Sequence, residues 1–302
     1  MTLHPQAVAA LREWSRGPSV SDAGFGPADI AAMRTQGRAD AAAEPKEPVD
    51  RVEDVDADGV PCRLLVPGRS AQGVLVFLHG GGFVFGDLDT HDAQSRRLAN
   101  RTGLTVLAVD YRRPPEHRFP AAVDDVDTVL AWLRREGRAQ GLDPARVAVI
   151  GDSAGGNLAL VASLRNPGLL AATVLVYPFL DPGTGLPSYA AVDGGLTREE
   201  AQWYWRHYAG TREHLDAPDL APLASPPERW RDVKEPVLLQ IAEHDVLVDE
   251  NRRLAQRLEE AGVDVRVTTY PGMIHGFWRR PDAFDAGEEA LAEAAAFLAE
   301  HV

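Results

Sequence analysis

Short apolar runs alternate with longer amphipathic segments along the chain from about residue 50 onward. Such alternation is typical of a largely parallel sheet covered by helices on both faces, so the sequence predicts an α/β fold. Val52 to Val55 and Val60 to Val66 flank Asp58-Gly59, which predicts an antiparallel hairpin at the start of the sheet. Six further runs have the length and composition of buried strands and bring the predicted sheet to eight: Val74 to Leu78, Thr105 to Val109, Val147 to Ile150, Thr173 to Val176, Val237 to Ile241, and Val263 to Thr268.

Helices are predicted between these strands. An apolar stripe with helical spacing lies between the fourth and fifth strands, at Ala122, Val126, Leu130 and Leu133. The segment from Arg252 to Gly262 ends in a glycine, as helices often do, and an Ala-rich segment from Gly287 to Val302 closes the chain. Residues 1–45 and 181–234 do not follow the alternation. We therefore expect both regions to be additions to the sheet.

Composition narrows the class of protein. The chain has 302 residues, 45% of them apolar and 25% charged, which is typical of a globular protein. Lys and Arg number 31 against 45 Asp and Glu, and the resulting net charge of −14 would repel a phosphate backbone or an anionic membrane. We therefore expect neither nucleic acid nor a membrane as a partner.

The amino terminus and the one cysteine bear on location. Residues 1–14 contain no apolar run long enough for a signal peptide, and the least polar stretch, residues 147–164, is interrupted by polar and glycine residues. Cys62 lies in a predicted strand, where we expect a buried and unreactive thiol. These features predict a cytoplasmic location.

Gly151-Asp152-Ser153-Ala154-Gly155 fits the pattern G-x-S-x-G between a predicted strand and a predicted helix from Asn157 to Leu164. Glycine removes the Cβ clash that a tight turn would otherwise produce, so the serine can adopt a strained, exposed conformation near a helix amino terminus. Ser153 is therefore a candidate nucleophile. The simplest alternative is a glycine-rich turn without a chemical role.

His79-Gly80-Gly81-Gly82 follows the strand from Val74 to Leu78. Three successive glycines let backbone N–H groups approach one point, which predicts an oxyanion hole completed by the N–H of Ala154. A phosphate-cradling loop is the alternative, but no G-K-S/T sequence follows. We expect His79 to anchor the loop rather than react.

A serine nucleophile needs a base and an acid. His275 lies between the last strand and the last helix and is the preferred base, with His244 as the rival. Asp245 is the preferred acid because it follows its strand directly and fits the chain order serine, acid, histidine. Asp249 is expected to cap the helix that begins near Glu250, and Glu243 is the fallback acid.

These residues resemble the hormone-sensitive-lipase-like α/β-hydrolases, the bacterial family IV carboxylesterases, over most of residues 50–280. The segments that carry the resemblance are His79 to Phe83 with Gly86 to Asp92, Asp110 to Arg112 with Pro115 to His117, Phe119 to Ala122, Gly151 to Asn157, Asp245 to Glu250, and Tyr270 to Phe277. The resemblance implies a Ser153, Asp245 and His275 triad, and an oxyanion hole made by Gly81, Gly82 and Ala154. It implies no metal and no organic cofactor.

The same resemblance implies a helical cap over the site. Residues 1–45 would form its first part and residues 181–234 its second, with the catalytic domain in residues 46–180 and 235–302. One departure is Arg113-Pro114, where the family has two small apolar residues, and it bears on substrate fit. The presumed cap holds an aromatic cluster expected to pack on the body and to bound a small acyl pocket: Trp203, Tyr204, Trp205, His207 and Tyr208.

The leading hypothesis is a serine carboxylesterase that hydrolyses small, short-acyl esters through an acyl-enzyme. An alternative is a deacetylase that cleaves an amide or ester on a specialised metabolite, because the same triad serves amides. An alternative of another class is a receptor that binds a small ligand without turnover, since the fold alone does not determine function. A homodimer is also compatible with the sequence.

Overall fold

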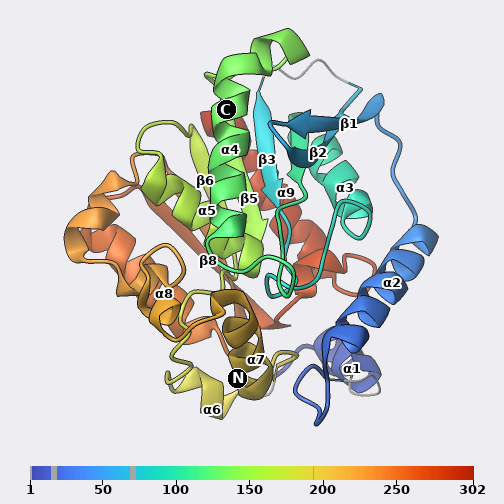
Figure 1. The fold of residues 1–302 in the computed structure, drawn as a ribbon, viewed down its shortest axis with the longest axis vertical. Coiled ribbons are helices and arrows are strands. Elements are labelled where there is room, and N and C mark those ends of the chain that lie inside the picture. The colour runs from blue at the N-terminus through green and yellow to red at the C-terminus, as the bar shows by residue number, and fades with distance from the viewer. Residues whose placement is uncertain (1, 15–18, 69–72, 193) are drawn as a thin grey trace.

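The computed structural model describes residues 2–14, 19–68, 73–192 and 194–302, and one eight-stranded sheet forms its centre (Figure 1). The strand order is β1-β2-β4-β3-β5-β6-β7-β8. β2 pairs antiparallel with β1 and β4, and the other neighbouring strands run parallel. The strands are β1 Arg51–Ala57, β2 Val60–Val66, β3 Val74–Leu78, β4 Thr105–Val109, β5 Val147–Asp152, β6 Ala172–Val176, β7 Val237–His244 and β8 Val265–Ile274. The predicted α/β class and the eight strands are confirmed. Parts of the predicted regions, at Met1, 15–18, 69–72 and Asp193, lie outside the described residues.

The predicted hairpin is formed by β1 and β2. Asp58 and Gly59 connect the two strands, with φ angles of 56° and 91°. Positive φ at both central positions is what a two-residue turn needs to match the twist of its strands. Asp56 supports the turn, because its Oδ1 accepts a hydrogen bond from Gly59 N at 2.6 Å.

Helices cover both faces of the sheet (Figure 1). Val74, Val76 and Leu78 of β3 belong to a core with α4, α5 and α8, whereas Leu75 and Phe77 belong to a core with α3 and α9. The side chains of one strand alternate between the two cores, as a strand buried on both faces requires. The helices concerned are α3 Asp92–Thr102, α4 Ala121–Glu136, α5 Ala154–Arg165, α8 Val248–Glu260 and α9 Asp285–His301.

The two regions expected to be additions contain helices and short turns. Residues 2–14 and 19–45 hold α1 Pro5–Trp14 and α2 Pro27–Ala43, and the segment 181–234 holds α6 Ser188–Ala191 and α7 Arg198–Ala209. Val20, Ile30 and Trp203 pack together with Val84, which follows the glycine loop after β3. Short 3₁₀ helices complete the chain: η1 Gly137–Gln140, η2 Glu213–Asp216, η3 Pro222–Ala224, η4 Pro227–Asp232 and η5 Phe277–Arg279.

Several boundaries differ from the predicted ones. α5 begins directly after Ser153, α8 begins four residues before the predicted helix, and β8 extends to Ile274. The expectation that Asp249 caps this helix was wrong, because Leu247 occupies the cap position and Asp249 lies in the first turn. α3 was not predicted, because its sequence is polar; the structure buries Asp92, Gln94 and Ser95 within it.

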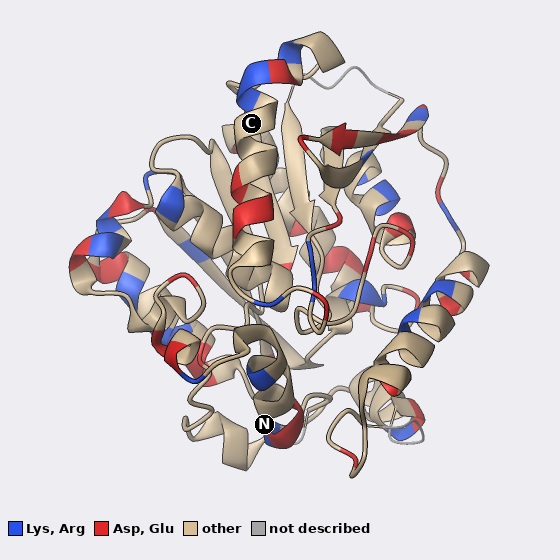
Figure 2. Ribbon diagram, in the orientation of Figure 1, with Lys and Arg blue, Asp and Glu red and all other residues tan. Residues whose placement is uncertain are grey.

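Charge is distributed over the outer elements. β3, β4 and β6 contain no charged residue, whereas acidic and basic residues occupy the covering helices and loops (Figure 2).

Cys62 is fully buried in β2 as expected, and burial raises the pKa of its thiol. None of the described helices is both long enough and apolar enough to cross a membrane.

Candidate active site

Ser153 occupies the single position between β5 and α5, with a φ of 53°. Glycine is required on both sides of it. A Cβ on Gly151 would lie 2.2 Å from the carbonyl oxygen of Gly155, and a Cβ on Gly155 would lie 1.9 Å from the carbonyl oxygen of Leu78. The G-x-S-x-G pattern is therefore explained by steric contact, and the strained serine is held at the amino end of a helix.

Backbone bonds hold the strained turn in place. Ser153 N donates to Val176 O at 2.9 Å, and Ser153 O accepts from Phe179 N at 3.0 Å. The buried Asn157 side chain donates from Nδ2 to Phe179 O at 2.8 Å and to Leu220 O at 3.0 Å. These bonds join the turn to the segment after β6, so the serine position depends on two neighbouring strands.

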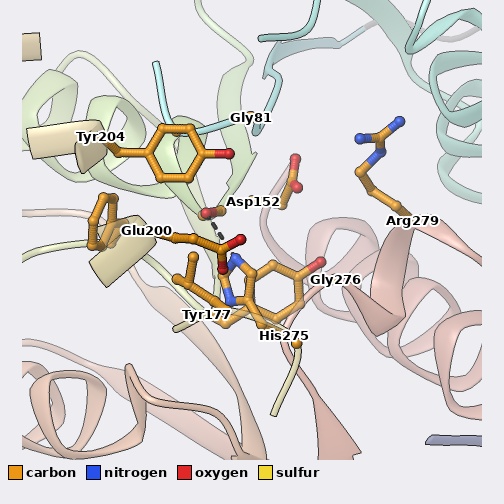
Figure 3. Close-up of a pocket in the computed structure, with 13 residues that line it drawn as sticks. Gly81, Asp152, Tyr177, Glu200, Tyr204, His275, Gly276 and Arg279 are labelled. Carbon is orange, nitrogen blue, oxygen red and sulfur yellow. Dashed lines mark hydrogen bonds between the residues drawn. The ribbon is translucent and has the colours of Figure 1, made fainter. Parts of the chain in front are cut away.

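The structure brings Ser153, His275 and Asp245 together in one chain of hydrogen bonds. His275 Nε2 lies 3.0 Å from Ser153 Oγ, a contact drawn as the dashed line in Figure 3, and His275 Nδ1 lies 2.7 Å from Asp245 Oδ2. Asp245 is buried, and its Oδ1 accepts from Leu247 N at 3.0 Å. The second bond orients the imidazole, leaving Nε2 free to accept the serine proton.

Two opposing effects act on the pKa of His275, the proposed base. Burial lowers the pKa of His275, but the charge of Asp245 and its hydrogen bond outweigh burial, so the pKa is raised. An imidazole that gains a proton more readily is a stronger base, which suits proton transfer from a serine hydroxyl.

The other residues considered near the triad, His244, Glu243 and Asp249, have different contacts. His244 Nε2 is buried without a hydrogen-bond partner in the described part of the chain, 3.7 Å from Glu243 Oε2. Glu243 Oε2 accepts from Gly272 N at 2.8 Å, and Asp249 Oδ2 accepts from Ser188 N at 2.9 Å. Both carboxylates therefore bind backbone groups, and neither is hydrogen-bonded to His275.

The glycine loop after β3 lies beside Ser153. Gly81 and Gly82 have φ angles of 112° and 59°, and both line the same cavity as Ser153. Within the described residues, neither of their N–H groups donates to a protein acceptor. Ala154 is the first residue of α5, where a backbone N–H has no partner within its own helix. This arrangement leaves three donors for a developing negative charge.

His79 anchors this loop, as expected. Its Nδ1 lies 2.8 Å from Gly80 O, and Tyr111 donates from its hydroxyl to His79 O at 2.7 Å. Burial, assisted by the charge of Arg113, lowers the pKa of His79 to about 3, so the ring is neutral. Arg113 Nη1 lies 3.5 Å from His79 Nε2 and also pairs with Asp110. The Arg113-Pro114 departure thus bears on the anchor, and neither residue is among those that line the cavity at Ser153.

Asp152 is a site residue that sequence reasoning missed, because it occupied a variable position of the G-x-S-x-G pattern. Its Oδ1 accepts from Gly80 N at 2.9 Å, which joins the serine turn to the glycine loop. Burial raises the pKa of Asp152, although Arg279 acts in the opposite direction.

A cavity of about 220 Å³ opens at Ser153. The Tyr204 ring closes part of it and touches Gly82, where a Cβ would lie 2.1 Å from Tyr204 Cδ1. Trp205 instead packs against Phe179, with ring centroids 4.2 Å apart, and is absent from the cavity wall. The full lining is Gly81, Gly82, Asp152, Ser153, Tyr177, Phe179, Gly195, Leu196, Glu200, Tyr204, His275, Gly276 and Arg279.

Comparison with known proteins gives one consistent result. A family model described as alpha/beta hydrolase fold matches residues 75–279. The chain is 34% identical to the ethyl acetate hydrolase of Pseudomonas putida over 82% of this chain and 80% of that protein. It is 32% identical to the acetyl esterase of Salmonella choleraesuis over 79% of this chain and 76% of the other. A solved hyperthermophilic esterase from the archaeon Pyrobaculum calidifontis superposes with a TM-score of 0.89 at 32% identity, covering 99% and 98% of the two chains.

Proposed function

Since this chain belongs to the hormone-sensitive-lipase-like α/β-hydrolases, we propose that it is a serine carboxylesterase that hydrolyses small, short-acyl esters. The observation that carries the proposal is the chain of hydrogen bonds from Ser153 Oγ through His275 to Asp245. The ethyl acetate hydrolase and acetyl esterase among its relatives support the choice of short-acyl substrates.

The proposed reaction proceeds in two halves. Ser153 Oγ attacks the ester carbonyl carbon while His275 Nε2 takes its proton, and Asp245 stabilises the imidazolium that forms. The carbonyl oxygen becomes an oxyanion that accepts hydrogen bonds from the N–H groups of Gly81, Gly82 and Ala154. The tetrahedral intermediate then collapses, and His275 gives its proton to the departing alkoxide, which leaves as the alcohol.

Water completes the cycle. His275 removes a proton from a water molecule, whose oxygen attacks the carbonyl carbon of the acyl-enzyme. The second tetrahedral intermediate uses the same three N–H donors. Its collapse breaks the bond to Ser153 Oγ, which recovers a proton from His275 and releases the carboxylic acid.

We further propose that residues 1–45 and 181–234 form a cap and that residues 46–180 and 235–302 form the catalytic domain. Two observations support this division. Leu196, Glu200 and Tyr204 of the segment 181–234 line the cavity at Ser153. Ser19 Oγ donates to Glu200 Oε1 at 2.7 Å, which links the two proposed cap segments.

We also propose that the protein is located in the cytoplasm and forms a homodimer. The net charge of −14 supports the expectation that nucleic acid is not a partner. Cell fractionation tests the location, and light scattering on the purified chain tests the oligomeric state.

The proposed function is tested with Ser153→Ala. We expect loss of p-nitrophenyl butyrate hydrolysis by several orders of magnitude, because the nucleophile is removed while the glycines that shape the turn remain. A serine-directed organophosphonate should label Ser153 in the parent protein. Hydrolysis by the variant at the parental rate would refute the assignment, and binding without turnover by the parent would favour a receptor. A matched p-nitroanilide distinguishes amide from ester cleavage.

A further inference from the structure

Arg279 gives the cavity at Ser153 a cationic wall. It is the last residue of η5, four positions after His275, and its half-buried side chain lines the cavity. Figure 3 shows Arg279 at one side of the site, with Asp152 drawn between it and His275. Neither the hydrolytic mechanism nor the sequence motifs assign it a role.

The Arg279 guanidinium has no ion-pair or hydrogen-bond partner in the part of the chain that the structure describes; its backbone N–H donates to Gly276 O at 3.3 Å, and its backbone oxygen accepts from Arg97 Nη2 at 3.5 Å. Two other arginines, Arg280 and Arg38, do have ion-pair partners. Arg280 pairs with Asp282 at 3.2 Å, and Arg38 pairs with Asp87 at 2.6 Å. A half-buried cation loses hydration without compensation unless an anion approaches it. Arg279 is therefore suited to an anionic ligand.

Tyr177 lines the same cavity. The Tyr177 hydroxyl is buried, and no side chain or backbone group among residues 2–14, 19–68, 73–192 and 194–302 accepts its proton. Its ring lies beside that of His275, with centroids 4.7 Å apart. In Figure 3 the hydroxyl points to the side of the cavity where Arg279 lies. The hydroxyl oxygen itself is shielded from the cavity, so Tyr177 contributes its ring to the wall and leaves Arg279 as the group that faces an anionic ligand.

Two acidic residues line the same cavity, and both already accept hydrogen bonds from the protein. Thr197 N and Ser19 Oγ donate to the Glu200 carboxylate, which reaches toward His275 in Figure 3. The Asp152 carboxylate is buried and accepts from Gly80 N at 2.9 Å; burial raises its pKa, and the charge of Arg279 acts in the opposite direction. The cavity wall therefore contains two carboxylates, Glu200 and Asp152, and the guanidinium of Arg279, which has no hydrogen-bond partner within the described residues.

We propose that Arg279 binds a carboxylate carried by the substrate, so that the preferred substrates are acidic esters. This inference rests on the proposed esterase function and specifies its substrate class. A guanidinium forms charge-assisted, often bidentate hydrogen bonds with a carboxylate. The carboxylate belongs to either the acyl half or the alcohol half of the ester, and the experiment has one arm for each.

The acyl arm compares the p-nitrophenyl monoester of succinic acid with p-nitrophenyl butyrate, which share a leaving group and chain length. The alcohol arm compares acetoxyacetate with isobutyl acetate, measured by acetate release. We expect the parent protein to have the higher kcat/KM for the acidic member of at least one pair. Added salt should raise KM for that acidic ester and leave KM for its neutral counterpart nearly constant.

Arg279→Gln is the decisive variant. The ratio of kcat/KM for the acidic ester to that for the neutral ester should fall roughly ten- to a hundredfold, the range for hydrogen bonds to charged groups. The loss should be mainly in KM, because a carboxylate remote from the reacting carbon is bound equally in the ground state and the transition state. Arg279→Lys should keep part of the preference, because it keeps the positive charge but loses the bidentate geometry.

Arg280→Gln is the matched control. Arg280 is the next residue in the chain, pairs with Asp282, and is not among the residues that line the cavity at Ser153. The ratio should not change in this variant. A thermal melt of each variant verifies that it is folded.

Two results would overturn the inference. In one, Arg279→Gln lowers kcat/KM equally for acidic and neutral esters, which would mean that Arg279 only balances the charge of Asp152. In the other, the parent protein hydrolyses neutral esters at least as well as acidic ones in both arms. If the parent hydrolyses none of the four esters, the proposed function itself fails, and the inference fails with it.

Discussion

At the scale of single residues, the chemistry depends on how neighbours change the basicity of one imidazole. His275 is withdrawn from water, which by itself disfavours its charged form. Asp245 reverses this effect with its charge and a 2.7 Å hydrogen bond, and the net result is a raised pKa. Activity that needs neutral His275 should therefore increase as pH rises through that raised pKa.

Asp245→Asn tests this balance. In the parent protein, kcat/KM for a neutral ester should rise with pH with a midpoint above about 6.5, the ordinary histidine value. The variant lacks the charge that raises the pKa but keeps the burial that lowers it, so the midpoint should move to lower pH. The rate should fall by roughly a thousandfold or more, because the imidazole loses its orienting acceptor. The measurement is a pH–rate profile.

The control for this profile is Asp249→Asn, because Asp249 binds Ser188 N rather than the imidazole. Its midpoint should stay at the parental pH. An unmoved midpoint in Asp245→Asn would show that Asp245 does not set the basicity of His275.

At the scale of elements, hydrogen bonds to α8 hold the segment that follows β6 in place. Its Glu250 is fully buried and accepts hydrogen bonds from Leu180 N at 2.7 Å, Asp181 N at 3.2 Å and the Tyr189 hydroxyl at 3.1 Å. One carboxylate thus satisfies two backbone donors and a phenol where the chain enters the proposed second cap segment. Burial outweighs the bond from Leu180 and raises the pKa of Glu250.

Glu250→Ala should lower the free energy of unfolding by about 3 kcal/mol, because three donors lose their partner inside the protein. Urea unfolding measures the difference. Glu260→Ala is the control on the same helix, since Glu260 is exposed and its ion pair with Arg257 is 3.9 Å long. Equal stability of the two variants would mean that the three bonds to Glu250 contribute nothing to stability.

At the scale of the whole molecule, the aromatic residues of the second proposed cap segment have two roles. One of them lines the cavity, and others pack the segment onto the rest of the protein. The sequence predicted that the aromatic cluster from Trp203 to Tyr208 bounds the acyl pocket. In the structure, Tyr204 alone of this cluster lines the cavity within the described chain. Trp205 and Tyr208 are buried and pack on Phe83, which follows the glycine loop.

Tyr204→Ala and Trp205→Ala should therefore differ. A series of p-nitrophenyl esters from acetyl to dodecanoyl should show a maximum at short chains in the parent protein, because the cavity measures only about 220 Å³. Tyr204→Ala should move this maximum toward longer chains. Trp205→Ala should instead lower the free energy of unfolding by about 3–5 kcal/mol, the usual cost of truncating a buried tryptophan.

A thermal melt and the ester series separate these outcomes. The same shift in chain-length preference in both variants would contradict the different positions of the two rings. Faster hydrolysis of long-chain triglyceride emulsions than of dissolved short-chain esters would contradict the short-acyl substrate class.

The local sequence was sufficient to identify features that depend on a few adjacent residues. Continuous apolar runs predicted β3 to β7 nearly at their observed bounds, because strands buried on both faces tolerate little else. The glycines around Ser153 and after His79 predicted two tight turns, because a Cβ there would collide with backbone or with a packed side chain. Chain order then selected Asp245 and His275, which the structure joins through hydrogen bonds to Ser153.

Contacts between distant segments required the tertiary structure. Asp152 binds the glycine loop across 72 residues of chain, and Arg279 reaches the cavity from a turn whose sequence carries no motif. α3 was missed because its polar residues are buried by partners far away in the sequence. The free energy of each such contact depends on how deeply the groups are buried and on which charges lie nearby. Burial and charge environment are set only when folding brings the carboxyl ends of the strands together. The sequence by itself therefore determined which residues could react, and the tertiary structure decided which charges surround them.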